Sequence, residues 1–287
     1  NLKDSMEKIK QVIYLDNNAS TPVDHKVIEA MLPYFSDVFA NANSTHLLGS
    51  KANNAVKVAR EQVSELIGSD SNEIVFTSGA TEAINLAIKG VSESRFSEGK
   101  HIVTVSTEHS AVLDTCRYLE RNGYDVTYLP VDNYGLIDLN ELRNVIRDDT
   151  ILVSIMYVNN ETGVIQPIKE IADITHKTNA LFMSDCTQAV GKISINVDDL
   201  GVDLMCFSGH KMYAPKGIGA LYIRQKDNRV RISPLLHGGG HERGLRSGTL
   251  NVTGIVGLGK ACDIAQVEMN LNYQRILLLY HQFHIYQ

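Results

Sequence analysis

The sequence predicts an α/β fold with a mostly parallel central sheet and helices on both faces. Short apolar runs alternate along the chain with stretches of helical hydrophobic periodicity. The apolar runs are nearly continuous, which is typical of strands that are covered on both faces. No internal repeat and no low-complexity linker interrupts this pattern. These three observations together favour one large α/β unit.

Strands are predicted where the short apolar runs occur: EIVFTSG (73–79), HIVTVST (101–107), DVTYLPV (125–131), TILVSIMYVNN (150–160), ALFMSD (180–185), VDLMCFS (202–208) and GIGALYI (217–223). The last two runs are joined by only a short link, so this pair can be antiparallel.

Helices are predicted where apolar residues recur every three to four positions. These segments are 50–68, 81–91, 111–123 and 168–179, and a long helix is predicted to begin near Gly254. In the first helix, Gly68 suits the C-cap. One apolar stripe is expected along that helix, made of Ala55, Val58, Ala59, Val63, Leu66 and Ile67.

Composition and charge exclude several classes of function. Of the 287 residues, 44% are hydrophobic and 21% are charged, as in a globular protein. The formal net charge of −6 argues against a nucleic-acid partner. No apolar run is long enough to span a bilayer, and the first residues lack the order of a signal peptide. We therefore expect no membrane partner and a cytoplasmic location.

The cysteines and histidines predict no metal site. Cys116, Cys186, Cys206 and Cys262 are widely spaced and form no C-x-x-C pair, which favours reduced, buried thiols. His237 and His241 have no third ligand at a suitable spacing.

Polar residues gather where five of the predicted strands end. The clusters are Gly79-Ala80-Thr81, Glu108-His109, NNETG (159–163), Asp185 with Gln188, and His210-Lys211. In such a sheet, ligands bind beyond the carboxyl ends of the strands. Five polar clusters on one edge therefore predict a ligand site there.

Each cluster taken alone leaves several chemistries open. Gly79-Ala80-Thr81 can bind a phosphate or simply cap a helix, and it matches neither a P-loop nor a dinucleotide-binding glycine motif. Lys211 can be a phosphate partner or a Schiff-base amine. Asp185 can cap a helix, bind a metal or hold a protonated ring nitrogen. His109 can be a base or a flat ring stacked on another.

One cofactor uses all of these groups together. Pyridoxal 5'-phosphate (PLP) needs a lysine for covalent attachment, an acid beside its pyridinium nitrogen and a phosphate cup. The acid keeps the nitrogen protonated, so the ring can draw off carbanion charge. A strand end suits Lys211 because its amine then points into a largely dry cleft, where it is a weakly hydrated nucleophile.

The motifs resemble those of the cysteine desulfurases, PLP enzymes of fold type I in the class V aminotransferase group. The resemblance covers roughly residues 12–270. It is carried by YLDNNASTPVD (14–24), FTSGATEAINLA (76–87), TEHSAVLDTC (107–116), VNNETGVIQPI (158–168), DCTQAVGK (185–192), SGHKMYAPKGIGALY (208–222) and GGGHERGLRSGTLN (238–251).

The resemblance implies a role for each candidate site residue. Lys211 would bind the cofactor covalently, and His109 would stack on its ring and help to move protons. Asp185 would pair with the ring nitrogen, and Gln188 with the ring hydroxyl. The phosphate would be bound by Thr81, Ser208, His210 and the backbone of Ala80. Asn160 would lie on the ring and substrate side. Thr249 would contact the phosphate in the other subunit of a homodimer.

The resemblance also implies a reaction and a division of the chain. Sulfur would be removed from L-cysteine to give alanine and a persulfide for iron–sulfur cluster assembly or thiolation, through a sulfur-acceptor or scaffold protein. A selenocysteine lyase-like enzyme is an alternative. Residues 1–20 would be an N-terminal arm, 21–260 the cofactor-binding large domain, and 261–287 the start of a helix leading to a small C-terminal domain that is largely absent.

The end of the chain departs from the family pattern. In the family, the small domain carries the nucleophilic cysteine and the arginine that binds the substrate carboxylate, and no cysteine follows Cys262 here. A second alternative is therefore a PLP-binding remnant or half-enzyme. Without a partner domain, Ile276, Leu277, Leu278, Leu279 and Phe283 are expected to be exposed.

Overall fold

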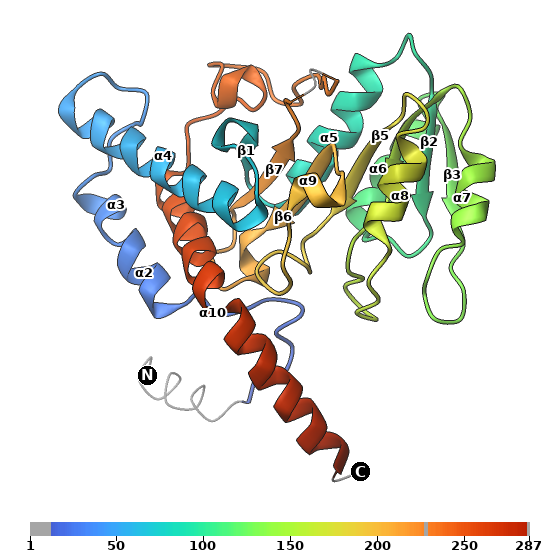
Figure 1. The fold of residues 1–287 in the computed structure, drawn as a ribbon. Helices are drawn as coiled ribbons and strands as arrows, with labels where there is room; N and C mark the ends of the chain where they lie inside the picture. Colours follow the sequence, from blue (N-terminus) through green and yellow to red (C-terminus); the bar gives the residue numbers. More distant parts are fainter. Residues whose placement is uncertain (1–12, 227–228, 286–287) are drawn as a thin grey trace, which may run out of the picture.

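A seven-stranded sheet forms the centre of the molecule (Figure 1). The computed structural model describes residues 13–226 and 229–285, with side chains up to residue 282. The strands, in their order across the sheet, are β1 (Ile74–Thr77), β7 (Gly219–Ile223), β6 (Leu204–Ser208), β5 (Leu181–Asp185), β4 (Thr150–Ser154), β2 (His101–Val105) and β3 (Asp125–Leu129). All seven predicted strands are confirmed.

Six of the strands run in the same direction. β2, β3, β4, β5 and β6 pair in parallel, and β7 lies antiparallel between β6 and β1. Because β7 reverses the direction twice, β1 runs the same way as β6. The carboxyl ends of β1, β2, β4, β5 and β6 therefore lie on one edge, as the sequence predicted.

Helices cover both faces of the sheet. On one face, α5 (Ala80–Ser94) and α6 (Ser110–Glu120) bury Ile84, Ile88 and Val112 against Ile102, Leu152 and Leu221. On the other face, a larger core joins the strands to α4 (Leu47–Ile67), α8 (Ile168–Thr175) and α10 (Val252–Ile285). This is the two-faced covering that continuous apolar strands predict.

The buried stripe of α4 differs from the predicted one. Val58 is 44% exposed and Ala55 is half-buried, whereas Ala52 and Val56 are buried. Positions 52, 56, 59, 63 and 66 recur every three to four residues and face the core, and Val58 lies about 200° around the helix from Val56. Gly68 ends the helix in the left-handed region, with φ of 69°, as expected for a C-cap.

Four short helices lie outside the predicted ones: α2 (His25–Met31), α3 (Pro33–Ser36), α7 (Leu139–Val145) and α9 (Val197–Leu200). They span seven residues or fewer, too short to show a helical period. Side-chain caps at Asp24, Asp138 and Asn196 begin three of them, each accepting a hydrogen bond from a backbone amide of the first turn.

The last helix, α10, begins in the core and then leaves the body of the molecule (Figure 1). Ile255, Leu258 and Cys262 are buried, and Gly259 lets the helix approach α4, since a Cβ there would lie 2.6 Å from Ala59 Cα. Farther along, Leu271 is 71% exposed, and Ile276, Leu277, Leu278 and Leu279 are exposed as expected. The side chain of Phe283 lies outside the described residues.

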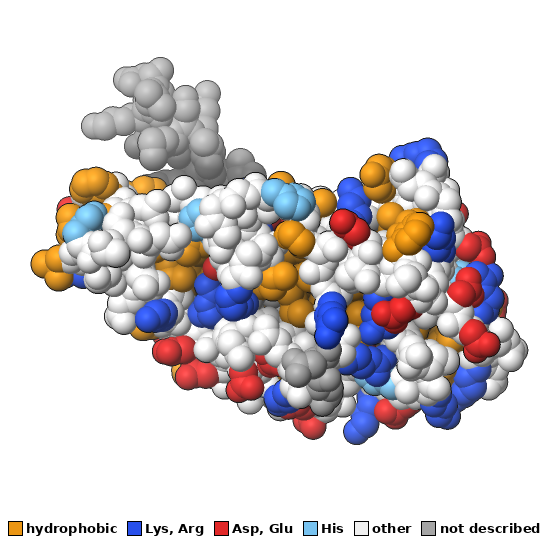
Figure 2. Space-filling view, turned by 90° about the horizontal axis from the view of Figure 1, so that it is seen from above, with side chains coloured by type: hydrophobic (Ala, Val, Ile, Leu, Met, Phe, Trp, Pro, Cys, Tyr) orange, Lys and Arg blue, Asp and Glu red, His pale blue; other side chains and the backbone are white. Residues whose placement is uncertain are grey.

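Charge is mixed over the face shown in Figure 2, where acidic and basic side chains lie among one another. Of the helices in the described part of the chain, none combines the length and the apolar character needed to cross a membrane.

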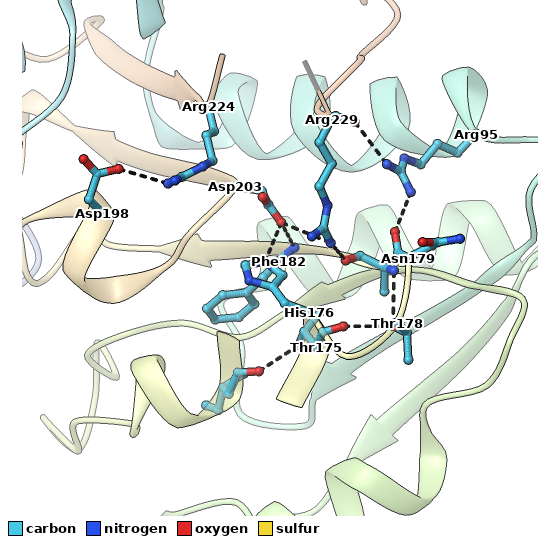
Figure 3. Close-up of polar contacts among 12 residues, drawn as sticks. Arg95, Thr175, His176, Thr178, Asn179, Phe182, Asp198, Asp203, Arg224 and Arg229 are labelled. Carbon is cyan, nitrogen blue, oxygen red and sulfur yellow. Dashed lines mark hydrogen bonds and ion pairs between the residues drawn. The ribbon is translucent and has the colours of Figure 1, made fainter. Parts of the chain in front are cut away.

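A buried carboxylate joins the strands at the opposite edge from their carboxyl ends (Figure 3). Asp203, just before β6, accepts hydrogen bonds from the backbone amide of Phe182 at 2.8 Å and from His176 Nε2 at 2.9 Å. Arg229 Nη2 lies 3.9 Å away. Asp203 therefore ties β5, β6 and the end of α8 together.

Arg95 extends this network to α5. Its guanidinium donates to the backbone oxygen of Asn179 at 2.6 Å and to that of Arg229 at 3.1 Å. These contacts attach the segment after β7 to the turn before β5 (Figure 3).

Replacing Asp203 by Ala is expected to lower the free energy of unfolding by about 2–4 kcal/mol, because the buried Phe182 amide loses its acceptor and Arg229 loses a nearby negative charge. Urea denaturation followed by circular dichroism measures the change. Asp173→Ala, at an exposed position of α8, is the matched control and should leave stability within about 0.5 kcal/mol of the parent. Equal denaturation midpoints for the two variants would contradict the stabilising role assigned to Asp203.

Candidate active site

A cavity of about 730 Å³ lies at the carboxyl edge of the sheet. Its walls come from the ends of β1, β2, β4, β5 and β6 and from the N-terminal segment 16–20. Nine of the ten predicted site residues line it: Ala80, Thr81, His109, Asn160, Asp185, Gln188, Ser208, His210 and Lys211. The size lies within the range of about 300–1,000 Å³ typical of small-molecule sites.

The first turn of α5 forms an anion cup beside β7. Gly79 precedes the helix with φ of 152°, a conformation that favours glycine. Gly219 allows the close approach, because a Cβ there would lie 2.7 Å from Gly79 Cα and 2.6 Å from the Phe207 oxygen. The amides of a first helical turn have no partner within the helix. With Ser208 beside them, these amides can bind a phosphate.

Lys211 is held by the N-terminal segment. Its Nζ donates to the backbone oxygens of Asn18 and Ala19, both at 2.8 Å. Burial lowers the pKa of the Lys211 amine, and the charges of Asp16 and Asp185 act against this shift. The result is an amine inside the cavity that gives up its proton more easily than a surface lysine.

The segment before α2 is pinned to the turn that follows β6. Thr21 donates from its backbone amide and from Oγ1 to the His210 oxygen, at 2.9 and 3.0 Å, and Oγ1 accepts from the Tyr213 amide at 2.8 Å. Ser20 Oγ lies 3.3 Å from His210 Nδ1. This arrangement makes residues 16–20 a wall of the site. The predicted arm also includes residues 1–12, which lie outside the described residues.

A buried carboxylate forms the floor of the cavity. Asp185 is 6% exposed, and its Oδ1 accepts from the Thr187 amide at 2.9 Å. Burial raises the pKa of the Asp185 carboxyl, and the hydrogen bond from the Thr187 amide acts against this shift. The hydroxyl of Thr187 is buried without a hydrogen-bond partner among the described residues. A ligand with a cationic N–H would relieve the cost of burying the Asp185 charge.

Gln188 and Lys192 extend this floor. Gln188 Nε2 donates to the Asn18 oxygen at 3.2 Å, and its Oε1 accepts from Lys192 Nζ. Burial, with the nearby charge of Lys211, lowers the pKa of Lys192 to about 8. Lys192 is part of the DCTQAVGK segment, but sequence reasoning assigned it no role.

His109 is the N-cap residue of α6 and is exposed at the cavity. Its Nδ1 accepts from the Ala111 amide at 3.1 Å, so in the neutral ring the proton is on Nε2. Glu108, beside it, is buried: Oε1 accepts from the Met156 amide at 2.5 Å, and Oε2 has no partner among the described residues. Burial raises the pKa of Glu108 well above its usual range, and the nearby Asp185 adds to the effect.

The tenth predicted residue, Thr249, lies outside the cavity and is exposed. It belongs to the segment 238–251, which is anchored to the rest of the fold. Glu242 in this segment is buried and accepts from Arg60 Nη2 at 2.6 Å and from the Phe76 amide at 2.8 Å. Glu242 and Arg243 are held at φ of 48° and 58°. Sequence reasoning missed this anchor because Glu242 and Arg60 are far apart in the chain.

The cysteines are all buried, and in the described residues no group of three His, Cys, Asp or Glu side chains is placed to hold a metal. Burial raises the pKa of Cys116 to about 12, and it also raises the pKa of Cys186, Cys206 and Cys262. Thiols of this kind are poor nucleophiles because the thiolate is the reactive form.

Comparison with known proteins gives consistent relatives. The family model "Aminotransferase class-V" matches residues 13–284. The chain is 54% identical over 272 residues to the cysteine desulfurase IscS of Anaeromyxobacter sp. (strain Fw109-5), covering 94% of this chain and 67% of that protein. It is 56% identical over 274 residues to the cysteine desulfurase IscS of Edwardsiella ictaluri (strain 93-146), covering 94% and 68%.

Solved structures show the same relationship. A NifS-like protein superposes with a TM-score of 0.87 at 46% identity, covering 90% of this chain and 70% of that one. SspA in complex with cysteine superposes with a TM-score of 0.85 at 47% identity, covering 88% and 72%. The chain thus spans about two thirds of the length of these relatives. It belongs to the class-V aminotransferase family, among the cysteine desulfurases, which are PLP-dependent enzymes.

Proposed function

We propose that this chain is the PLP-binding part of a cysteine desulfurase that acts on L-cysteine and yields alanine and a persulfide. The observation that carries the proposal is a cavity where five strand ends bring a lysine, a buried carboxylate and a helix N-terminus together. The likeness to SspA, solved with cysteine, supports the choice of substrate.

In this proposal the cavity holds the two ends of PLP with different groups. The amides of Ala80 and Thr81, with Ser208 and His210, bind the phosphate. Asp185 pairs with the ring nitrogen, and Gln188 with the ring hydroxyl. When bound, PLP supplies an electron sink for negative charge that develops on the substrate.

Lys211 and His109 are the proposed catalytic residues. The lowered pKa of Lys211 favours covalent attachment of the cofactor, because the unprotonated amine is the nucleophile. His109 stacks on the ring, and its Nε2 is available to exchange a proton because Nδ1 is held by the Ala111 amide. Asn160, on the ring and substrate side, completes the set.

Sulfur acceptance requires a residue that residues 1–287 do not supply. The four cysteines are buried, so we propose that the nucleophilic cysteine comes from another polypeptide segment. By likeness to the family, the arginine for the substrate carboxylate would come from the same segment. Residues 1–287 taken alone would then bind the cofactor without completing the reaction, which is the half-enzyme alternative. Its exposed apolar residues on α10 support 261–287 as a connecting helix that follows an arm (1–20) and a large domain (21–260).

The proposed biological setting follows the family. It is a cytoplasmic homodimer in which Thr249 reaches the partner's phosphate, and the sulfur passes to an acceptor or scaffold protein for iron–sulfur cluster assembly or thiolation. The exposure of Thr249 outside its own cavity supports the contact with a partner.

Adding PLP to the purified protein is expected to produce an absorption band in the visible range that depends on Lys211. Lys211→Ala should lose the band, because the covalent attachment is lost. Lys216→Ala, at an exposed lysine of the same cavity, should keep it. A band of equal strength in the Lys211→Ala protein would contradict the assignment of Lys211 as the residue that binds PLP covalently.

The four thiols are expected to resist modification in the folded protein. A chromogenic disulfide reagent should react with all four only after denaturation, since burial keeps the thiols protonated and covered. The measurement is the number of thiols titrated per chain with and without denaturant. A fast-reacting thiol in the folded protein would contradict the proposal that none of the four cysteines is the nucleophile.

The chain alone is expected to form alanine from L-cysteine at less than about 1% of the rate that it shows with a complementing segment containing the nucleophilic cysteine. Loss of a nucleophile typically costs at least about two orders of magnitude in rate. The test compares alanine release with and without the segment. Robust turnover by the chain alone would contradict the half-enzyme proposal.

A further inference from the structure

An ion pair joins the anion cup at the first turn of α5 to the segment 238–251. Arg246 Nε donates to Glu82 Oε1 at 2.7 Å, and Nη2 donates to Oε2 at 3.2 Å. The two side chains are 20% and 13% exposed. A two-pronged contact between partly buried charges is the strong form of this interaction. The pair has no role in the function proposed above.

Glu82 lies among the groups that would bind the phosphate. It belongs to the first turn of α5 and lines the cavity, and it closes the turn before the helix by accepting from the Ser78 amide at 2.9 Å. Burial opposes the ionised form, but the hydrogen bonds from Arg246 and Ser78 lower the pKa of Glu82 overall. A carboxylate is therefore charged at the place where the helix would bind a dianion.

Two negative groups so close repel one another strongly in a partly dry cavity. The repulsion would cancel part of the attraction that the helix N-terminus offers to a phosphate. Arg246 is suited to remove this conflict, because it neutralises Glu82 without being one of the cavity-lining residues of the described chain.

The segment that carries Arg246 is firmly held. The buried pair of Arg60 and Glu242 attaches it to β1, the strand that leads into the cup. Gly248, with φ of 125°, leaves room for the guanidinium, since a Cβ there would lie 3.3 Å from Arg246 Nη1. The arginine is therefore positioned before any ligand arrives.

We propose that Arg246 is a positioning residue for the phosphate of PLP: it neutralises Glu82 and holds it against the turn before α5, so that the helix N-terminus can bind a dianion. The inference rests on the proposed placement of the phosphate at this cup. It adds a residue that acts on the cofactor through another side chain.

The test is an equilibrium titration of the cofactor-free protein with PLP and, separately, with unphosphorylated pyridoxal. Arg246→Ala should weaken PLP binding by about tenfold or more, equivalent to about 1.4 kcal/mol, and leave pyridoxal binding unchanged. The double variant Arg246→Ala/Glu82→Gln should return to within about threefold of the parent. The glutamine is neutral, and its amide oxygen can still accept from Ser78.

Controls separate charge from folding. Arg121→Ala removes an exposed arginine of the same charge and should not change PLP affinity. Thermal unfolding of each cofactor-free variant shows whether the fold is intact. Equal PLP affinity for Arg246→Ala and parent overturns the inference, as does an equal loss for pyridoxal or a double variant as weak as the single one. A parent protein that binds no PLP overturns the proposed function as well.

Discussion

The pairing of β7 between β1 and β6 is the constraint on which the cavity depends. Gly219 stands opposite Thr77 in β1 and opposite Ser208 in β6. Gly219, which has no side chain, therefore lies beside both the cup that follows β1 and the turn that carries Lys211, and it lets the two approach each other. Because β7 is antiparallel to both neighbours, their carboxyl ends meet at one edge. If β1 instead ran opposite to β6, its carboxyl end, with the cup, would lie about a strand length away from the lysine.

The two edges of the sheet use buried charge in opposite ways. At the amino edge, Asp203 is satisfied by Phe182 and His176, and the contacts lock strands together. At the carboxyl edge, Glu108 and Thr187 keep buried oxygens without partners among the described residues. Unsatisfied buried groups are costly, so they persist where the surrounding structure is well stabilised and the site has a use for them.

Sequence patterns revealed much of this arrangement, with limits that have physical causes. The strands were evident because buried parallel strands are continuous apolar runs, and the strand ends then indicated nine of the residues that line the cavity. The stripe on α4 was wrong at Val58 because Ala and Val do not distinguish neighbouring faces of a helix. The partner of Glu82 was out of reach, since Arg246 follows 164 positions later. A local pattern cannot report a contact made by folding.

The hold of the N-terminal segment on Lys211 affects how the protein is made. The lysine amine bonds to Asn18 and Ala19, which precede it by 193 and 192 positions. Contacts between such distant parts of a chain form late, because much of the intervening chain has to be ordered first. During synthesis the first wall of the site therefore waits until β6 has left the ribosome and joined the sheet. A chain halted before β6 would also lack β7, the strand that pairs with β1 beside the cup, so neither the cup nor the Lys211 amine would be in place. Cofactor binding at the proposed site would therefore require a completely folded sheet.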